Sequence, residues 1–330
     1  MLQVYQEINM ALTIDHQTNE ISNATGAITV NGVAVGGDNS PKWYGARYVH
    51  AGGASTVNVM DYVTIQTTGN ATDFGDLTVG RYLGAGTSNG SRGVFGGGYT
   101  GSNQDVIDYI TIGTTGNATD FGNMSVARRR MASLSNGTRG VFAGGEGSGQ
   151  NVMDYITIAT TGNATDFGDL TQNSSNNGGG ICDGTIGVFH TPSGDDLYRT
   201  EKITVATTGN ATDYGALSYY LTDSTSNISD TTYGVFCAGI NQGSESRIER
   251  ITIATNGNGT DVGDLNTHNM AIGGGGGDAS RGIVAGGDAT ANGPSNVIQY
   301  LTISASSGNA ADFGDLTRGV YRAAGGAAGT

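Results

Sequence analysis

The chain has 330 residues, enough for one large domain or two ordinary ones, and carries 58 glycines but only 3 prolines. Its 29 acidic residues against 15 lysines and arginines give a formal net charge of −14, and such a surface repels the phosphate backbone of nucleic acids. Many short runs of Val, Ile, Phe and Tyr between glycine-rich turns exclude a collagen-like or disordered chain and indicate an all-β protein.

Residues 1–42 predict a small attachment segment separate from the main domain of residues 43–330. The first 20 residues lack the basic and apolar regions of a secretory signal peptide, and no run in the chain reaches the roughly 18 apolar residues of a membrane-spanning helix. The sequence "AITVNGVAV" predicts a β-hairpin with Asn31-Gly32 as its two-residue turn. Because a lone hairpin is marginally stable in water, we expect it to dock on the main domain of its own chain, on sister chains or on a virion.

An eleven-residue phrase then recurs six times, beginning with "TTGNATDFGDL" at residues 67–77. Each copy lies in a unit of about 47 residues, the period expected of an array of supersecondary repeats. The unit holds four strand-sized runs: small residues such as "YLGAG", an apolar run such as "RGVFGGG", an alternating run such as "DVIDYITI", and the phrase itself. Four-stranded units of this length predict a β-propeller, and six units predict six blades.

The two ends of the chain predict how the propeller closes. After the sixth phrase the chain supplies one more run of small residues, at 322–328, and stops. The matching second, third and fourth strands of that blade lie in residues 46–77. We therefore expect one blade built from both termini, a clasp that leaves no open sheet edge.

The repeated phrase is interpreted as scaffold, because six copies of one catalytic site make little chemical sense. Its "TTGNA" part predicts a turn between the third and fourth strands. Its aromatic residue is expected to fill the gap between blades, a role that falls to Val262 in the fifth unit. The aspartate before it is expected to accept backbone N–H bonds in an Asx-type turn. These structural positions are Asp73, Phe74, Asp120, Phe121, Asp166, Phe167, Asp213, Tyr214, Asp261, Asp312 and Phe313.

Three smaller features carry weaker signals. Cys182 and Cys237 are too few for a disulfide framework and are expected to be buried free thiols. The histidines at 16, 50, 190 and 268 show no zinc-ligand spacing. The run Arg128, Arg129 and Arg130 is expected to be a solvated loop rather than a binding patch.

The units resemble Kelch repeats over residues 45–330. The Kelch pattern of a double glycine, a Tyr/Asp pair, an outer aromatic and an arginine matches Gly97-Gly98, Asp108-Tyr109, Phe121 and Arg128 or Arg129. The resemblance departs in the fourth unit, which has "VFHTPSG" and "TEKITV", and in the absence of the usual outer Trp. It implies the fold and leaves the activity open, because one fold hosts many functions.

Residues 10–36 and the phrase "TGNATDFGDLT" resemble segments of marine bacteriophage structural proteins of the tail-fibre type. This resemblance implies a virion protein, of tail or head, whose residues 1–42 attach to other virion proteins, with a homo-oligomer left open. It also implies a host-surface glycan or protein as receptor, no enzymatic activity and no cofactor.

The loops between second and third strands and between blades differ from unit to unit, and variation on a repeated scaffold is typical of a binding surface. Aromatic residues next to acids suit sugar stacking and hydroxyl recognition. The candidate ligand-binding residues are Tyr99, His190, Asp195, Asp196, Tyr198, Tyr219 and Tyr220.

Two other function classes would leave different marks in the sequence. A copper oxidase on a Kelch scaffold needs two Tyr and two His at the axis, and the sialidase signature is absent, since the only tryptophan is Trp43. A cellular carbohydrate-binding adhesin would explain the Asn-x-Thr sequons at Asn70, Asn117, Asn163 and Asn210, although turn chemistry explains them better. No metal site is expected, and no EF-hand spacing is present, but the acidic balance leaves calcium open.

Overall fold

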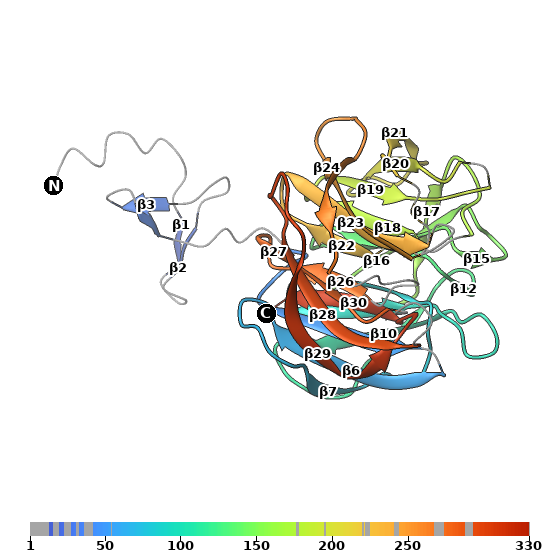
Figure 1. Cartoon of the computed structure of the whole chain (residues 1–330), viewed down its shortest axis with the longest axis horizontal. Helices are drawn as coiled ribbons and strands as arrows, with labels where there is room; N and C mark the ends of the chain where they lie inside the picture. Colours follow the sequence, from blue (N-terminus) through green and yellow to red (C-terminus); the bar gives the residue numbers. More distant parts are fainter. Residues whose placement is uncertain are drawn as a thin grey trace. The chain divides into compact units, whose positions relative to one another are not determined.

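The fold is an all-β, six-bladed propeller, seen in a computed structural model of the chain (Figure 1). The structure describes residues 13–15, 20–22, 28–30, 33–35, 42–53, 55–175, 178–194, 196–219, 221, 225–240, 244–266, 274–287 and 293–329. The chain divides into two compact units, Met1–Pro41 and Lys42–Thr330. None of the described residues forms a helix of the length and apolarity required to cross a bilayer.

The first unit contains two short antiparallel hairpins. β1 (Thr13–Asp15) pairs with β2 (Glu20–Ser22), and β3 (Ile28–Val30) pairs with β4 (Val33–Val35). The register Val30↔Val33 is that of the predicted hairpin. Its turn, Asn31-Gly32, lies outside the described residues.

The second unit holds six four-stranded antiparallel sheets, and each is described from its innermost strand outward. Blade 1 is β30 (Gly325–Gly329), β5 (Arg47–Gly53), β6 (Val57–Thr64) and β7 (Thr72–Asp76). Blade 2 is β8 (Ala85–Ser88), β9 (Arg92–Gly96), β10 (Val106–Thr111) and β11 (Thr119–Asn123). Blade 3 is β13 (Ala132–Ser135), β14 (Arg139–Ala143), β16 (Val152–Thr157) and β17 (Thr165–Asp169).

The other three blades follow the same plan. Blade 4 is β18 (Gly179–Cys182), β19 (Ile186–His190), β20 (Arg199–Thr204) and β21 (Thr212–Ala216). Blade 5 is β22 (Thr225–Ser229), β23 (Tyr233–Ile240), β24 (Ser244–Thr252) and β25 (Thr260–Asp264). Blade 6 is β26 (Gly274–Gly277), β27 (Arg281–Ala285), β28 (Ser295–Thr302) and β29 (Ala311–Val320). A two-stranded addition, β12 (Arg128–Arg129) with β15 (Glu146–Gly147), lies between blades 2 and 3.

The predicted clasp is confirmed. β30, from the C-terminal end, pairs with β5 in the register Ala327↔Val49, so the first blade contains both ends of the second unit. The six innermost strands each neighbour the next, and β26 neighbours β30, which closes the ring.

Small residues line the axis because six strands converge there. A Cβ on Gly180 would lie 2.3 Å from the carbonyl oxygen of Ser133 in the neighbouring blade. The second strands are continuous buried runs, as in "RGVFA" of β14, because each is covered on both faces. The third strands alternate more, as in "VMDYIT" of β16, and each places a polar side chain in the interior: an aspartate in blades 1–3, a glutamate in blades 4 and 5, and a glutamine in blade 6.

The repeated phrase joins each blade to the next. At the seam between blades 1 and 2, the N–H groups of Gly116 and Ala118 donate to the carbonyls of Phe74 and Asp76 at 2.7 Å. In the other direction, the N–H of Asp76 donates to Oδ1 of Asn117 at 3.0 Å. The same asparagine bond recurs at every seam, with acceptors Asn70, Asn117, Asn163, Asn210, Asn258 and Asn309.

The glycine after the aromatic is required by this close approach. Gly168 has φ +137°, and a Cβ there would lie 2.6 Å from the backbone of Gly209 in the next blade. The aromatic before it is buried between blades, as predicted, with Phe167 only 2% exposed. The phrase is therefore the seam of the propeller.

The expected Asx turn of the phrase is wrong in five units. Only Asp261 accepts a backbone N–H, from Gly263 at 3.1 Å. The equivalent aspartates of the other units are exposed and accept no such bond among the described residues. The N–H at the end of each outer strand instead donates to the asparagine in the turn of the next blade, as the N–H of Asp76 does to Asn117.

The expectation of a solvated arginine run is also wrong. Arg128 is fully buried and pairs with the buried carboxylate of Asp154 at 2.7 Å. Arg129 pairs with Glu146 across the two-stranded addition, and its guanidinium lies 4.4 Å from the ring centroid of Tyr99. The arginine that matches the expected repeat position is therefore Arg128. Both cysteines are buried and free, as predicted.

Candidate functional site

The propeller has two faces of different character. The turns between first and second strands and between third and fourth strands lie at one end of the antiparallel blades, and we call this end the constant face. A side-chain bond from Gln66 to Ser280 joins one turn of each kind there, at 3.1 Å. The loops between second and third strands and between blades lie at the opposite end, which we call the variable face.

The second unit begins at the axial end of the constant face. Trp43 donates its indole N–H to Ser229 of blade 5 at 3.1 Å, and its carbonyl oxygen accepts the Ser88 hydroxyl of blade 2 at 2.9 Å. A Cβ on Gly184, in blade 4, would lie 3.1 Å from its ring. One residue therefore spans three blades near the axis, and residues 42–46 enter on the face opposite the variable loops.

The structure places the seven predicted site residues in different environments. Asp196 and Tyr198 are exposed, Tyr198 at 45%, and Tyr219 is half-buried. Asp195 and Tyr220, like His16 and His268, lie outside the described residues.

His190 is a correction, because it is fully buried. β19 continues through His190, so its ring lies within the blade, where Nε2 is 3.2 Å from the carbonyl oxygen of Leu197. Burial lowers the pKa of His190 to about 4. The side chain is part of the interior and is not a surface ligand.

Tyr99 belongs to a cluster between blades 2 and 3. It packs edge-on against Tyr82, with ring centroids 5.5 Å apart, and beneath Arg129. Arg129 also donates to Asn103 at 3.2 Å and pairs with Glu146. The ring of Tyr99 thus packs within this loop cluster, between Tyr82 and Arg129.

Tyr198 and Tyr219 lie at the variable-face edge of blades 4 and 5. The carbonyl of Tyr198 accepts the N–H of Leu217 at 2.8 Å, which places Tyr198 beside the loop that carries Tyr219. The guanidinium of Arg247, near the start of β24, lies 4.0 Å from the ring centroid of Tyr219. We call Tyr198, Tyr219, Arg247, Asp261 and Asp264 the blade 4–5 corner.

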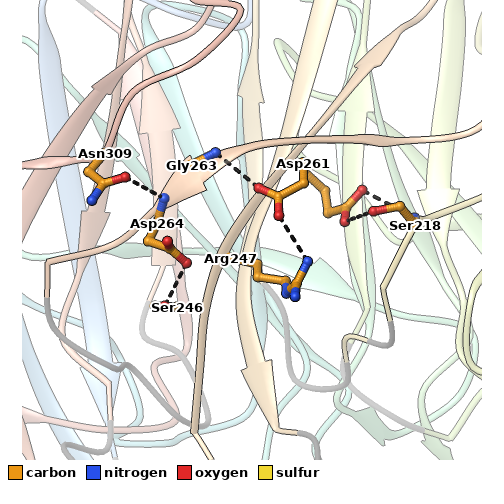
Figure 2. A network of polar contacts seen from close by, with 8 residues as sticks. Ser218, Ser246, Arg247, Asp261, Gly263, Asp264 and Asn309 are labelled. Atoms are coloured by element: carbon orange, nitrogen blue, oxygen red, sulfur yellow. Dashed lines mark hydrogen bonds and ion pairs between the residues drawn. The ribbon is translucent and has the colours of Figure 1, made fainter.

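The polar groups of this corner are held in place (Figure 2). Arg247 donates to Asp261 at 2.8 Å, while both side chains remain about two-fifths exposed, at 36% and 44%. Asp264 accepts the Ser246 hydroxyl at 2.8 Å, and its own N–H donates to Asn309 across the seam. One guanidinium and two carboxylates are therefore presented on a rigid strand pair.

A buried carboxylate underlies the corner. Glu249 is fully buried and accepts bonds from the hydroxyl and the N–H of Ser218. Burial raises the pKa of Glu249, Asp261 raises it further, and the Ser218 bonds and Arg247 oppose the rise. The Tyr219 loop is thus tied to blade 5 by its neighbour Ser218.

Arg247 of the corner stands in a blade whose preceding loop lacks the arginine found before blades 2 and 3. In blades 2 and 3 a buried aspartate of the third strand pairs with an arginine of the preceding loop, as Arg81 does with Asp108 at 2.6 Å. The loops before blades 4 and 5 carry Ser174 and Leu221 at that position. There the arginine comes from the third strand itself, as Arg199 or Arg247, where the other blades have valine.

Sequence reasoning missed Arg247 and Asp261 as site residues. A signal existed, because "SRIERI" in the fifth unit replaces the valine of "DVIDYI" with arginine. The exposed Tyr198 can stack on the apolar face of a sugar, and the carboxylates and the guanidinium can bond its hydroxyls. Among the described residues, no three His, Cys, Asp or Glu side chains are grouped as metal ligands would be.

The fold and this surface define a six-bladed β-propeller with one constant and one variable face. No protein-family model matches the chain, and no curated protein sequence matches it either.

Proposed function

We propose that the chain is a non-enzymatic bacteriophage virion protein of Kelch-like type, a receptor-binding propeller that contacts a host-surface glycan through the blade 4–5 corner. The observation that carries the proposal is the difference between the two faces. The units share the seam residues of the repeated phrase, whereas the loops of the variable face differ. Those of blades 4 and 5 carry the exposed Tyr198, and Tyr219 beside Arg247.

The place where residues 42–46 enter supports this orientation. Residues 1–42 attach the protein to other virion proteins in this proposal, and the chain enters the propeller on the constant face at Trp43. A tether at that face leaves the variable face available to a receptor. The segment resemblance of residues 10–36 to phage structural proteins supports a virion location.

Glycan binding by the full chain tests the corner. On an array of bacterial surface glycans, we expect the purified protein to bind a limited set of acidic or neutral sugars, and Tyr198→Ala and Arg247→Ala to lose at least about tenfold in affinity. Thr161→Ala is the control, because Thr161 is also exposed but lies on the constant face, in the turn between the third and fourth strands of blade 3. Equal loss in all three variants, or binding unchanged in the two corner variants, contradicts the corner as the site.

Immunogold electron microscopy with an antibody against residues 43–330 tests the virion part separately. Label at fibre or tail tips is the expected result. Label over the phage head identifies a decoration protein, and label on cell envelopes alone identifies a cellular adhesin; either result overturns the receptor-binding proposal.

A further inference from the structure

One seam of the propeller lacks its ring. At five of the six seams a Phe or Tyr of the outer strand fills the space against the next blade, and its exposed fraction is 2–3%. At the seam between blades 5 and 6 this position is Val262, which is 8% exposed. The turn that faces it is also different, because "TISASSGN" of blade 6 has one residue more than "TIGTTGN" of blade 2.

A cavity of about 120 Å³ occupies that seam. It is lined by the apolar side chains of Val235, Ile248, Val262, Leu301 and Ile303, and toward the turn by Thr302, the half-buried Ala305, and the exposed Ser307, Gly308 and Asn309. An apolar cavity of about 150 Å³ in another protein stays dry and binds benzene, so this volume is of the right order for one aromatic ring. The equivalent position in four other blades holds a phenyl group, which gives the shape of the missing occupant.

Blade 4 shows what the polar end of such an occupant would meet. There the ring is Tyr214, whose hydroxyl lies 2.7 Å from the carbonyl oxygens of both Thr252 and Thr255 and can donate its one proton to either. The corresponding residues of blade 6 are Thr302 and Ala305, since the N–H of Ala305 donates to Thr302 just as that of Thr255 donates to Thr252. Both line the cavity.

The carbonyl of Ala305 retains capacity for this bond. It accepts Nη1 of Arg250 at 2.6 Å, and a carbonyl oxygen has two lone pairs. The cavity thus combines an aliphatic wall with two backbone acceptors at the turn, the arrangement that a tyrosine side chain satisfies one seam away.

We propose that the seam between blades 5 and 6 is a binding site for a small uncharged phenol. The ring would lie against Val262 and Leu301, and the hydroxyl would donate to the carbonyl of Thr302 or Ala305. The site is distinct from the blade 4–5 corner and does not depend on glycan recognition.

The probe is p-cresol, the tyrosine side chain without its backbone, titrated into the full chain by calorimetry. We expect saturable binding with one site per chain. Val262→Phe should weaken it by at least about tenfold, because the new ring occupies the cavity. Val79→Phe, which adds the same ring at an exposed position, should bind as the wild type does. The ether 4-methylanisole, which cannot donate a hydrogen bond, should bind at least about threefold more weakly than p-cresol.

Methyl NMR of the wild-type protein keeps the proposal testable even where Val262→Phe fails to fold. Addition of p-cresol should shift the methyl resonances of Val262, Leu301 and Ile303 and leave those of Val94 and Val141 unchanged. Absence of saturable binding, full binding by a folded Val262→Phe, or shifts confined to other methyl groups would each overturn the site. Equal affinity for the ether would overturn the assignment of a phenol.

Discussion

The amide oxygen of Asn163 accepts the backbone N–H of Asn123 at 3.0 Å, across the seam between blades 2 and 3. Forty residues separate the two in sequence, yet the same bond links equivalent residues at all six seams. The asparagine of the repeated phrase therefore acts on the preceding blade and not on its own. The bond to the preceding blade explains why the same asparagine stands in the exposed turn of every unit.

Asn163→Ala should lower the free energy of unfolding by about 1 kcal/mol, the usual net value of one hydrogen bond. The loss stays modest because water can reach the freed N–H of Asn123. Urea unfolding followed by tryptophan fluorescence measures it. Thr161→Ala, in the same exposed turn and without a bond of this kind, should change the value by less than about 0.5 kcal/mol. Equal effects of the two substitutions would mean that the asparagine bond contributes nothing.

Arg128→Met should destabilise the protein by about 3–5 kcal/mol, because it leaves the buried carboxylate of Asp154 without its charge partner. The matched variant is Arg129→Met at the next position. Arg129 pairs with Glu146 where both side chains are partly exposed, so this change should cost under about 1 kcal/mol. Chemical denaturation of both variants provides the comparison. A similar cost for both would show that Arg128 is no more important to stability than its solvent-facing neighbour.

The blade plan was predictable from sequence because it rests on local chemistry that each unit repeats. The phrase fixes a turn, a buried ring and a glycine, and the unmatched strands at the two ends require the clasp formed by β30 and β5. Contacts between blades were not predictable in the same way. Whether Asp73 or Asn70 bonds across a seam depends on the register between two sheets, and a single repeat carries no information about it.

The candidate site was predictable only in part. Tyr198 and Tyr219 stood out as aromatics in diverging loops, and both lie at the corner. His190 was wrong because it stands at the buried last position of β19, which Gly96 and Ala143 occupy in the equivalent strands of blades 2 and 3. Arg247 was missed because its role is apparent only when two positions are compared. Leu221 stands where the loops before blades 2 and 3 have arginine, and Arg247 stands on the third strand where other blades have valine.

Deletion of residues 1–41 should leave the propeller folded, because all six sheets and the clasp lie in Lys42–Thr330. We expect the thermal midpoint to stay within about 3 °C of the full chain, which corresponds to about 1 kcal/mol in a protein of this size. Deletion of residues 1–46 also removes Trp43, which bonds to Ser229 and accepts from Ser88, and should lower the midpoint further. Differential scanning calorimetry distinguishes the two truncations. An unfolded 42–330 fragment would show that the first unit is needed for folding, and it would also remove the ground for treating residues 1–42 as an attachment segment.

His50→Phe should make the stability of the protein less sensitive to acid. His50 is fully buried, and burial, with a smaller contribution from Arg318, lowers its pKa to about 3. In the unfolded chain a histidine has a pKa near 6.5. Between about pH 6.5 and pH 3, His50 is therefore protonated in the unfolded state and neutral in the folded state. The free energy of unfolding therefore falls as the pH is lowered, by about 1.4 kcal/mol per pH unit from this residue, or roughly 3 kcal/mol between pH 6.5 and pH 4.

The substitution is a conservative one for this fold, since Phe95, Phe142, Phe189 and Phe236 occupy the same position in the second strands of four other blades. Urea unfolding at intervals between pH 4 and pH 7 measures the slope for both proteins. His190, Asp61 and Glu249 also have shifted pKa values, but they remain in both proteins, so the difference between the two slopes isolates His50. Loss of the contact between the Tyr48 hydroxyl and Nδ1 of His50, at 3.3 Å, changes stability equally at every pH. A difference between the proteins that is constant from pH 7 to pH 4 would therefore mean that the folded protein protonates His50 as readily as the unfolded chain does.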